Sequence, residues 1–341
     1  MSYSRLVVGD RFGTVLTELQ SDIEFASWRK NNIGQLKFTI ADTDSKATAT
    51  NLRFGNRVLI EFDNGLPNWG GLIDPPRTWQ DGKIIVTAYS GAYLFKYRTT
   101  DKGRYFTNQS VGEIFTALIN EANVIEDTGV EIGLIWDGGT NHSPDYHFKN
   151  LFEIFQKSLT SRLSTGDFEF IPTIIDGKIK FIANFYESRG TNKTGIALIQ
   201  GTNLSKVKLK EQGPIINSWD AVGEGTSWGD DRIDSNAIDF DSTGIYGLRE
   251  GSKVYADVSN QTTLDDNTVN LLSATKDVYN IFTLDALDVE PAGFADYDIG
   301  DVISLLAHDY GFGGTDTTIR ILSREFSPQS GKCSLVVQEE M

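Results

Sequence analysis

The chain has 341 residues, of which 39% are hydrophobic, so it can bury two or three cores of ordinary domain size. Its net charge of −16 and isoelectric point near 4.6 argue against an electrostatic grip on nucleic acid, because phosphate binding needs clustered Lys and Arg. The single cysteine, Cys333, excludes an intrachain disulfide and a thiolate metal cluster. Without an apolar run of roughly 18 residues or a standard signal pattern, we expect no membrane span and no signal-directed secretion.

The first hundred residues carry the apolar and polar alternation of half-buried β-strands. The alternating apolar positions are Ile23 and Phe25, then Leu36, Phe38 and Ile40, then Val58, Ile60 and Phe62. Turn-forming pairs, Asn64-Gly65 and Asp81-Gly82, separate such segments. We therefore expect residues 1–100 to form a domain of antiparallel β-structure.

Between residues 101 and 200 the apolar period changes to that of helices. Two segments begin with the spacing of a capping box, Ser110 with Glu113 and Asn150 with Glu153. Each of these pairs precedes an apolar run with one helical face. A hairpin that turns at Asp176-Gly177 follows the second run. The pattern predicts a middle α+β domain with two amphipathic helices.

Strand patterns resume from residue 201 to the C-terminus. A short helix is expected near Asp265 to Lys276. The segment from Gly223 to Gly251 is rich in Gly, Asp and Ser, which is typical of hairpin tips or a long loop. We expect residues 201–341 to form a second β-domain.

Two stretches of the sequence read as copies of one hairpin module. The first begins FGNRVLIEF at Phe54, and the second begins IGDVISLLA at Ile299. In both, Gly-Asn or Gly-Asp precedes an alternating strand, a second strand follows, and a Gly-Lys turn leads into a Val-rich strand. The repeat predicts a mainly β (α+β) fold, in which two similar antiparallel β-barrels with the same strand order flank the middle domain. Two barrels per chain would give a ring with twice as many lobes as chains.

The sequence has no HExxH, Walker or GxGxxG motif, and its one GxSxG match, GTSWG at residues 225–229, lies in the Gly-, Asp- and Ser-rich segment that we interpret as hairpin tips or a long loop. Cys333 lies in a strand pattern and His308 is the only histidine in the last half, so we interpret Cys333 as a buried structural thiol. His142 and His147 flank Asp145 without the helical spacing or second cluster that would support a metal site. We expect no catalytic, cofactor-binding or metal-binding residues and no enzyme activity.

Acidic and aromatic residues leave two other classes of function open. The densest acidic run lacks the register of a calcium loop and is interpreted as a solvated loop: Asp230, Asp231, Asp234, Asp239 and Asp241. Six tryptophans could stack on sugars, although Trp28 and Trp69 lie in strand patterns: Trp28, Trp69, Trp79, Trp136, Trp219 and Trp228. A carbohydrate- or receptor-binding protein and a glycan-degrading enzyme, for which 47 acidic residues could supply paired carboxylates, are the alternatives. Neither class requires the repeat.

Four motifs in succession resemble those of phage tail hub proteins. EFASWRKNNIGQLKFTI, residues 24–40, is followed by LRFGNRVLIEF, by WGGLI and by IIVTAYSGAYLFKYR, which ends at Arg98. With the later GDVISL strand, the resemblance covers most of the chain. The family comprises baseplate hubs and minor tail proteins of tailed bacteriophages, and its members often carry an appended lytic domain. This sequence stops at Met341 after its final strand, so we expect a hub without a lytic domain.

The resemblance implies a structural virion protein at the distal end of the phage tail. A homotrimeric ring of pseudo-sixfold symmetry would join the sixfold tail tube to the threefold tail tip and let DNA pass during ejection. The implied partners are a distal tail or tail tube ring above, a tape measure protein inside and a tail tip spike or fibre below, with no specific nucleic-acid binding. A carbohydrate- or receptor-binding tail protein is the alternative within the same particle. The surplus of 16 negative charges favours a channel wall that repels DNA.

Overall fold

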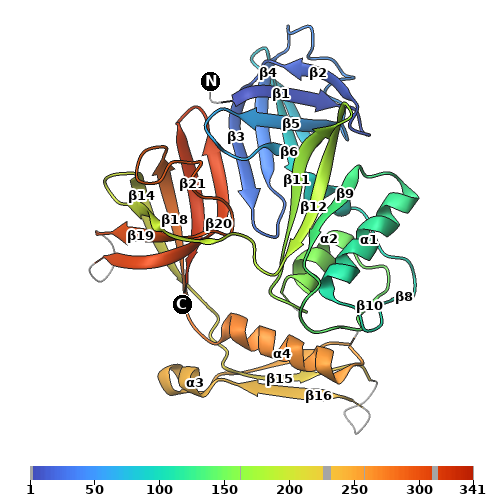
Figure 1. Ribbon diagram of the computed structural model, residues 1–341, viewed down its shortest axis with the longest axis vertical. Coiled ribbons are helices and arrows are strands. Elements are labelled where there is room, and N and C mark those ends of the chain that lie inside the picture. The colour runs from blue at the N-terminus through green and yellow to red at the C-terminus, as the bar shows by residue number, and fades with distance from the viewer. Residues whose placement is uncertain (1–2, 162, 226–231, 257, 309–313, 341) are drawn as a thin grey trace.

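The computed structural model describes residues 3–161, 163–225, 232–256, 258–308 and 314–340, which form four units (Figure 1). The first β unit, blue and cyan in Figure 1, contains β1 (Tyr3–Gly9), β2 (Val15–Leu19), β3 (Asp22–Arg29), β4 (Gln35–Ala41), β5 (Arg57–Phe62), β6 (Trp69–Gln80) and β7 (Lys83–Ser90). The last β unit, mostly red, contains β13 (Asn192–Ile199), β14 (Leu204–Gln212), β18 (Tyr279–Leu287), β19 (Val302–Ala307), β20 (Thr315–Ser327) and β21 (Lys332–Glu339). The chain is mainly β, as the alternation predicts.

The two β units share one sheet of 13 strands. The strand order is β3-β4-β7-β6-β5-β1 in the first β unit and β14-β18-β21-β20-β19-β13 in the last, so the order is the same in both copies. One detail differs, because β1 runs antiparallel to β5 whereas β13 runs parallel to β19. Among the described strands no pairing closes either unit into the expected barrel. The outer edge of β3 instead pairs with β20 of the last β unit and joins the two units.

The repeat extends to the backbone of its first turn. Gly55 and Gly300 both have φ of +88°, in the left-handed region that glycine adopts without strain. The N–H of Gly55 donates to the carbonyl of Ile73, and the N–H of Gly300 donates to that of Ile321, both over 2.8 Å. The carbonyl of the residue after each glycine accepts the N–H of the same isoleucine. The two modules therefore begin with the same hydrogen-bonded turn.

The middle unit lies between the β units in sequence and begins with a 3-10 helix. It contains η1 (Gly91–Phe95), β8 (Arg104–Tyr105), α1 (Val111–Ile125), β9 (Val130–Ile135), β10 (Asp145–Tyr146), α2 (Leu151–Glu153), the π-helix η2 (Ile154–Leu159), β11 (Asp167–Ile175) and β12 (Lys178–Tyr186). β11 and β12 form the expected hairpin around Asp176-Gly177, and β9 adds to β12 in parallel. The residues 192–199 that the sequence assigns to this domain instead form β13 of the last β unit.

Both expected capping positions begin helices. The Ser110 hydroxyl accepts the Glu113 N–H over 3.2 Å, and the Glu113 carboxylate accepts the Ser110 N–H over 2.8 Å, which completes the capping box of α1. The Asn150 side chain accepts the Glu153 N–H at the start of α2. The second helix is shorter than α1 and continues into the π-helix η2, so of these two helices α1 is the regular amphipathic one.

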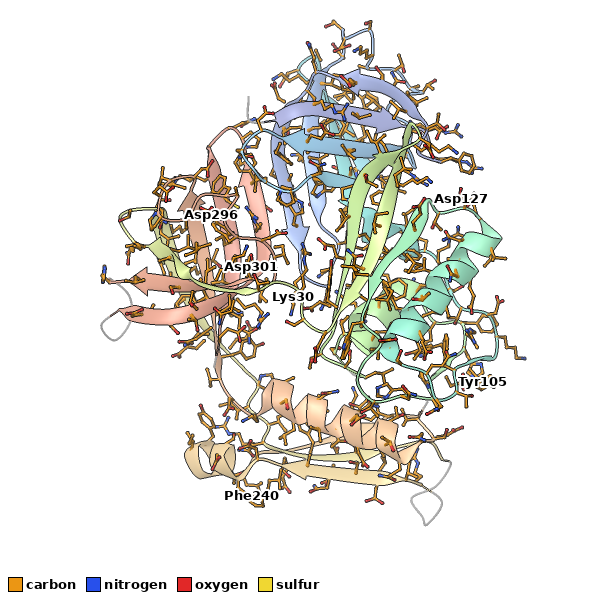
Figure 2. All side chains as sticks on the ribbon, in the orientation of Figure 1. Lys30, Tyr105, Asp127, Phe240, Asp296 and Asp301 are labelled. Carbon is orange, nitrogen blue, oxygen red and sulfur yellow. The ribbon has the colours of Figure 1, made fainter. Side chains whose placement is uncertain are left out.

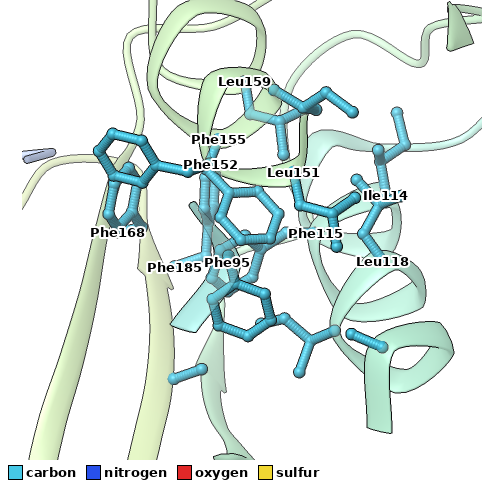
Figure 3. Packing of buried hydrophobic residues seen from close by; sticks show 14 of the residues in the cluster. Phe95, Ile114, Phe115, Leu118, Leu151, Phe152, Phe155, Leu159, Phe168 and Phe185 are labelled. Carbon is cyan, nitrogen blue, oxygen red and sulfur yellow. The ribbon is translucent and has the colours of Figure 1, made fainter. Parts of the chain in front are cut away.

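An aromatic core holds the helices of the middle unit to its sheet (Figure 3). The ring of Phe115 on α1 lies 4.8 Å from that of Phe155 on η2 and 5.2 Å from that of Phe185 on β12, measured between centroids. Phe95 lies 5.3 Å from Phe155 and brings the 3-10 helix that follows β7 into the same core. Aromatic pairs at these distances add about 0.5–1.5 kcal/mol each to the burial of their area.

A fourth unit is inserted between β14 and β18 (yellow to orange, at the bottom of Figure 1). It contains β15 (Ser218–Val222), β16 (Asp234–Ile238), α3 (Phe240–Tyr246), β17 (Glu250–Val254) and α4 (Gln261–Thr275). Its strands form a separate sheet in the order β16-β15-β17 with its own apolar cluster, so the range 201–341 is not one continuous β-domain. α4 matches the expected helix near residues 265–276 but begins earlier. The segment between residues 223 and 251, expected as hairpin tips or a long loop, contains β16, α3 and the start of β17, while residues 226–231 lie outside the described part.

Candidate functional site

The two β units meet at a seam between β20 and β3. Residues 323–326 of β20 pair antiparallel with residues 26–29 of β3. Four aromatic rings gather around the seam: Trp28, Phe62, Phe294 and Phe326. Phe326 is 1% exposed and packs edge-on against Phe62 with 5.9 Å between centroids. Burying one such ring stabilises by about 1.5–3 kcal/mol, so the seam fixes the two units relative to each other.

Arg324 lies beneath the seam and is fully buried. Its Nη1 donates to the Tyr297 carbonyl over 2.5 Å and its Nη2 donates to the Phe294 carbonyl over 2.8 Å. The guanidinium also stacks over the Tyr297 ring, 4.9 Å from the centroid, and lies 3.4 Å from a carboxylate oxygen of Asp298. The arginine therefore holds the loop before β19 against β20.

The first β unit repeats this contact with Arg77. Arg77 pairs with Val86 and Arg324 pairs with Leu335, and both partners stand three residues after the lysine of the Gly-Lys turn. Arg77 Nη1 donates to the carbonyl of Leu52, four residues before Asn56, as Arg324 does to a carbonyl four residues before Asp301. Sequence reasoning missed these two arginines. An Arg that precedes each Gly-Lys turn was the signal available.

Cys333 is buried on β21, as its strand pattern predicts. Burial raises the pKa of its thiol, although the neighbouring Arg324 opposes this shift. A thiol that is protonated and closed to solvent is inert, so the residue contributes packing.

A polar joint links the first β unit, the middle unit and the last β unit (Figure 2 labels Lys30 and Asp301 in this region). The carboxylate of Asp167 is 1% exposed and accepts from Lys30 Nζ over 3.0 Å and from Asn31 Nδ2 over 2.7 Å. Its second oxygen accepts the N–H of Arg189 over 2.8 Å. The carboxylate is fully paired where the β3–β4 turn reaches the middle unit.

Arg189 connects the same joint to the last β unit. Its Nη2 lies 2.5 Å from Glu169 Oε1 and 3.3 Å from Asp298 Oδ2. Burial raises the pKa of Glu169, and the charge of Arg189 opposes that shift. The Tyr186 hydroxyl donates to Glu169, and burial together with this carboxylate raises the pKa of Tyr186 to about 12. Glu169 and Arg189 also line a cavity of about 50 Å³ beside this ion-pair network.

Arg57, on β5, links the first β unit to the middle unit. Its guanidinium is 1% exposed and donates to the carbonyls of Ile179 over 2.8 Å and Thr128 over 2.9 Å. Burial lowers the pKa of Arg57, and nearby Asp127 opposes the shift. Gly129 is required here, because a Cβ at that position would stand 2.1 Å from Arg57 Nη1.

The structure brings two of the three residues of the loose histidine group together. His147 Nε2 lies 2.6 Å from Asp145 Oδ2, whereas His142 is buried and its backbone bridges to Gln109. Burial lowers the pKa of His142, which keeps the ring neutral. Within the described ranges no group of three or more His, Cys, Asp and Glu residues could hold a metal ion.

The acidic run is divided between structural roles and the part that is not described. Asp239 caps α3 by accepting the Ser242 N–H over 2.8 Å, and Asp234 begins β16. Asp230 and Asp231 lie outside the described residues, as does one of the tryptophans, Trp228. Asp241 lies in the first turn of α3.

The tryptophans that the structure describes do not line one face. Trp69 is buried in the core of the first β unit, Trp219 is buried against β17, and Trp136 packs on the middle core. Trp28 lies in the seam, and Trp79 is 61% exposed on β6. The arrangement therefore resembles core and interface packing more than a sugar platform.

The inserted unit meets the middle unit across an open cleft of about 450 Å³. Lys149, Lys157 and Lys253 line it together with Glu153 and the buried amide of Asn267. Apolar side chains, among them Ile154, Val254 and Leu271, also line this cleft, which is open, in contrast to the closely packed aromatic seam between the β units. In the described residues no helix is both long and apolar enough to span a membrane.

A model of the YQBQ-like family matches residues 23–212, more than half of the chain, while no curated protein matches it by sequence. Prophage tail protein gp18 from Listeria monocytogenes EGD-e has a TM-score of 0.62 at 12% identity, over 99% of this chain and 95% of that one. The 43 kDa tail protein of prophage MuSo2 from Shewanella oneidensis has a TM-score of 0.61 at 13% identity, over 99% and 98%.

The E. coli c3393 protein, a component of the type VI secretion system with structural similarity to T4 tail proteins gp27 and gp5, has a TM-score of 0.54 at 12% identity. That likeness spans 95% of this chain and 75% of the c3393 chain. At such identities the likeness is one of fold, and it extends over both β units and the units between them. The chain therefore belongs to the YQBQ-like family and has the fold of phage tail proteins, as its resemblance to tail hubs predicts.

Proposed function

We propose that this chain is a structural tail hub protein of a phage or prophage. In this proposal three copies form a ring of six similar β units between a sixfold tail tube and a threefold tail tip. The ring lies at the distal end of the tail, and DNA and the tape measure protein pass through its centre. A distal tail or tube protein contacts it above and a spike or fibre contacts it below.

The observation that carries the proposal is the seam between two β units with the same strand order. A contact between different surfaces of similar units is heterologous, and such contacts generate closed rings when their rotation closes. One chain supplies two units and one such contact. Repeating the contact around an axis gives each chain two positions in the ring, which is the way to match a threefold set of chains to sixfold neighbours.

The proposal includes a structural, non-enzymatic role. The polar groups that the structure brings together at the joint are paired with one another, and Cys333 is buried. Peptidoglycan, polysaccharide and peptide substrates should therefore remain intact after incubation with the purified protein. Turnover that disappears on changing a single acid such as Asp231 would contradict this part of the proposal.

The copy number in assembled tails tests the ring. Quantitative mass spectrometry of purified tail particles, calibrated on a tube protein with six copies per ring, should give three copies of this chain per tail. An image reconstruction of the same particles should show a channel with more acidic than basic side chains. Six copies per tail, or rings of Lys and Arg along the channel, would be incompatible with the proposal.

A further inference from the structure

The internal repeat gives the β20–β3 seam a counterpart that a single chain does not make. β6 corresponds to β20, and β14 corresponds to β3. β20 pairs with β19 through its N-terminal half and with β3 through residues 323–326. β6 pairs with β5 only through residues 69–72, and no described strand pairs with the same edge of residues 77–80.

The strand that corresponds to β3 also has an open edge. β3 lies between β4 and β20, whereas β14 pairs only with β18 among the described strands. The two strand edges left open in this way are the counterparts of the two edges that form the seam. An exposed edge is a template for pairing with another chain.

Side chains at the open edge of β6 match those buried in the seam. The registers with β7 and β21 place Trp79 at the position of Phe326, as they place Arg77 at that of Arg324. Phe326 is 1% exposed, whereas Trp79 is 61% exposed and the adjacent Phe54 is 43% exposed. The Arg77 guanidinium stacks between these two rings, 5.0 Å and 4.7 Å from their centroids. The first β unit thus exposes aromatic surface where the last β unit buries it.

We propose that residues 77–80 of β6 pair antiparallel with β14 of a second copy of this chain. The inference rests on the proposed ring and specifies its interface between chains. Seams within chains and between chains then alternate around the ring, and each buries an aromatic side chain from the β6 or β20 position. The occupant is a second copy because the contact continues the geometry of the seam already present within each chain.

The repeat also fixes the register of this pairing. In the first β unit, Ala26 pairs with Leu36 on the next strand, and Leu36 pairs with Ala88 on the strand after it. The same succession of cross-strand pairs in the last β unit begins at Leu209, so Leu209 of β14 occupies the position of Ala26. Since Phe326 pairs with Ala26, Trp79 faces Leu209 of the partner subunit. Thr78 then faces Lys210 of the partner subunit. Arg77 faces Glu211 of the partner subunit, a pair of opposite charge that favours this register.

A disulfide trap tests the register directly. The double variant Thr78→Cys with Lys210→Cys should cross-link between copies on oxidation of the purified chain, because strand partners have Cβ atoms close enough for a disulfide. The native Cys333 is buried and does not compete. Non-reducing electrophoresis should show dimers and trimers that revert to monomers on reduction.

Two matched variants serve as controls. Thr78→Cys with Lys208→Cys presents the same face two residues out of register, a displacement of about 6.8 Å that prevents a disulfide, so its cross-linking should fall at least about fivefold. Glu325→Cys with Ser27→Cys is the corresponding pair within one chain and should close inside monomers. The further change Trp79→Lys, on an exposed side chain, should leave the fold intact and weaken the intermolecular cross-link.

The outcomes separate this interface from the ring itself. The interface would be refuted if the two Thr78 pairs cross-linked equally. It would also be refuted if the Glu325 and Ser27 pair closed while the Thr78 and Lys210 pair gave no cross-link. Three copies per tail without this cross-link would leave the ring standing and refute the register. A ladder that continues beyond trimers would support the strand pairing and refute a closed threefold ring.

Discussion

Buried charged residues lie next to the turns of the repeated module. Each is held more by hydrogen bonds with backbone groups than by another side chain. Arg324 donates to two carbonyls of the loop before β19. Asp301, which follows Gly300, accepts the N–H groups of Thr191 over 2.7 Å and Asp298 over 2.8 Å. The hydrogen bonds of such residues fix the conformation of the loops beside the strands. Removing these residues leaves buried polar backbone groups without partners.

Replacing Arg324 with Leu should lower the free energy of unfolding by about 3–5 kcal/mol, since it leaves two buried carbonyls unpaired and a charge partner lost. Urea unfolding monitored by tryptophan fluorescence measures the change. The exposed Arg53→Ala is the control and should shift stability by less than about 0.5 kcal/mol. Equal effects of the two substitutions would refute the role of Arg324.

Acid sensitivity should arise in part from Asp301. Burial opposes ionisation of its carboxyl, but Lys193 at 2.8 Å and the N–H groups of Thr191 and Asp298 outweigh burial and lower the pKa. A carboxyl whose pKa is lower in the folded chain stabilises above its unfolded pKa of roughly 3.9, and this contribution is lost as the pH falls through the folded pKa.

The substitution Asp301→Asn tests this directly, because Asn56 occupies the corresponding position in the first β unit. At pH 7 it should cost about 1–3 kcal/mol through the lost ion pair and one lost acceptor. The gap between the two proteins should begin to narrow as the pH falls below the unfolded pKa of roughly 3.9 and narrow further as it approaches the lower pKa of the folded wild-type carboxyl. Unfolding free energies measured at a series of pH values check this, and a gap that stays constant down to pH 2.5 would contradict it.

At the scale of elements, the two modules use the same turn in different surroundings. Gly55 and Gly300 share φ of +88°, so an alanine at either position strains the backbone by about 1–2 kcal/mol. A Cβ on Gly55 would meet nothing within 4 Å, whereas a Cβ on Gly300 would stand 2.2 Å from the Arg189 carbonyl oxygen. Gly300→Ala should therefore lower the melting temperature clearly more than Gly55→Ala. Equal shifts in calorimetry would show that the contact with Arg189 is relieved without cost.

At the scale of the whole molecule, the inserted unit should be separable from the rest. Its apolar cluster, Ala221, Tyr255, Val258 and Leu264, is distinct from that of the last β unit. Gln212 at the end of β14 pairs with Tyr279 at the start of β18, so a two-residue turn can join them.

Replacing residues 213–278 with Asn-Gly should leave a chain that unfolds cooperatively and keeps its strand signal in circular dichroism. The same protein should retain the Glu325 and Ser27 disulfide closure that reports the seam. Loss of the cooperative transition would mean that the last β unit depends on the inserted unit for folding.

Local features of the sequence determined the elements of this protein. Three such features are the capping box at Ser110, the turn at Asp176-Gly177 and the alternation along β4 and β5. Each depends on residues a few positions apart, so each can be recognised in the sequence alone. That the two β units share one strand order was also predicted from the sequence, because the two modules carry the same succession of turn and strand.

Only the tertiary structure decided how these elements combine. The β20–β3 pairing joins residues about three hundred positions apart, and an alternating strand pattern states which face is buried without naming the strand beside it. For the same reason the inserted unit, the open edges of β6 and β14 and the burial of Arg57 and Arg324 were beyond sequence reasoning. The β20–β3 pairing and Arg57 join units, and the open edges are where we expect a second copy to bind.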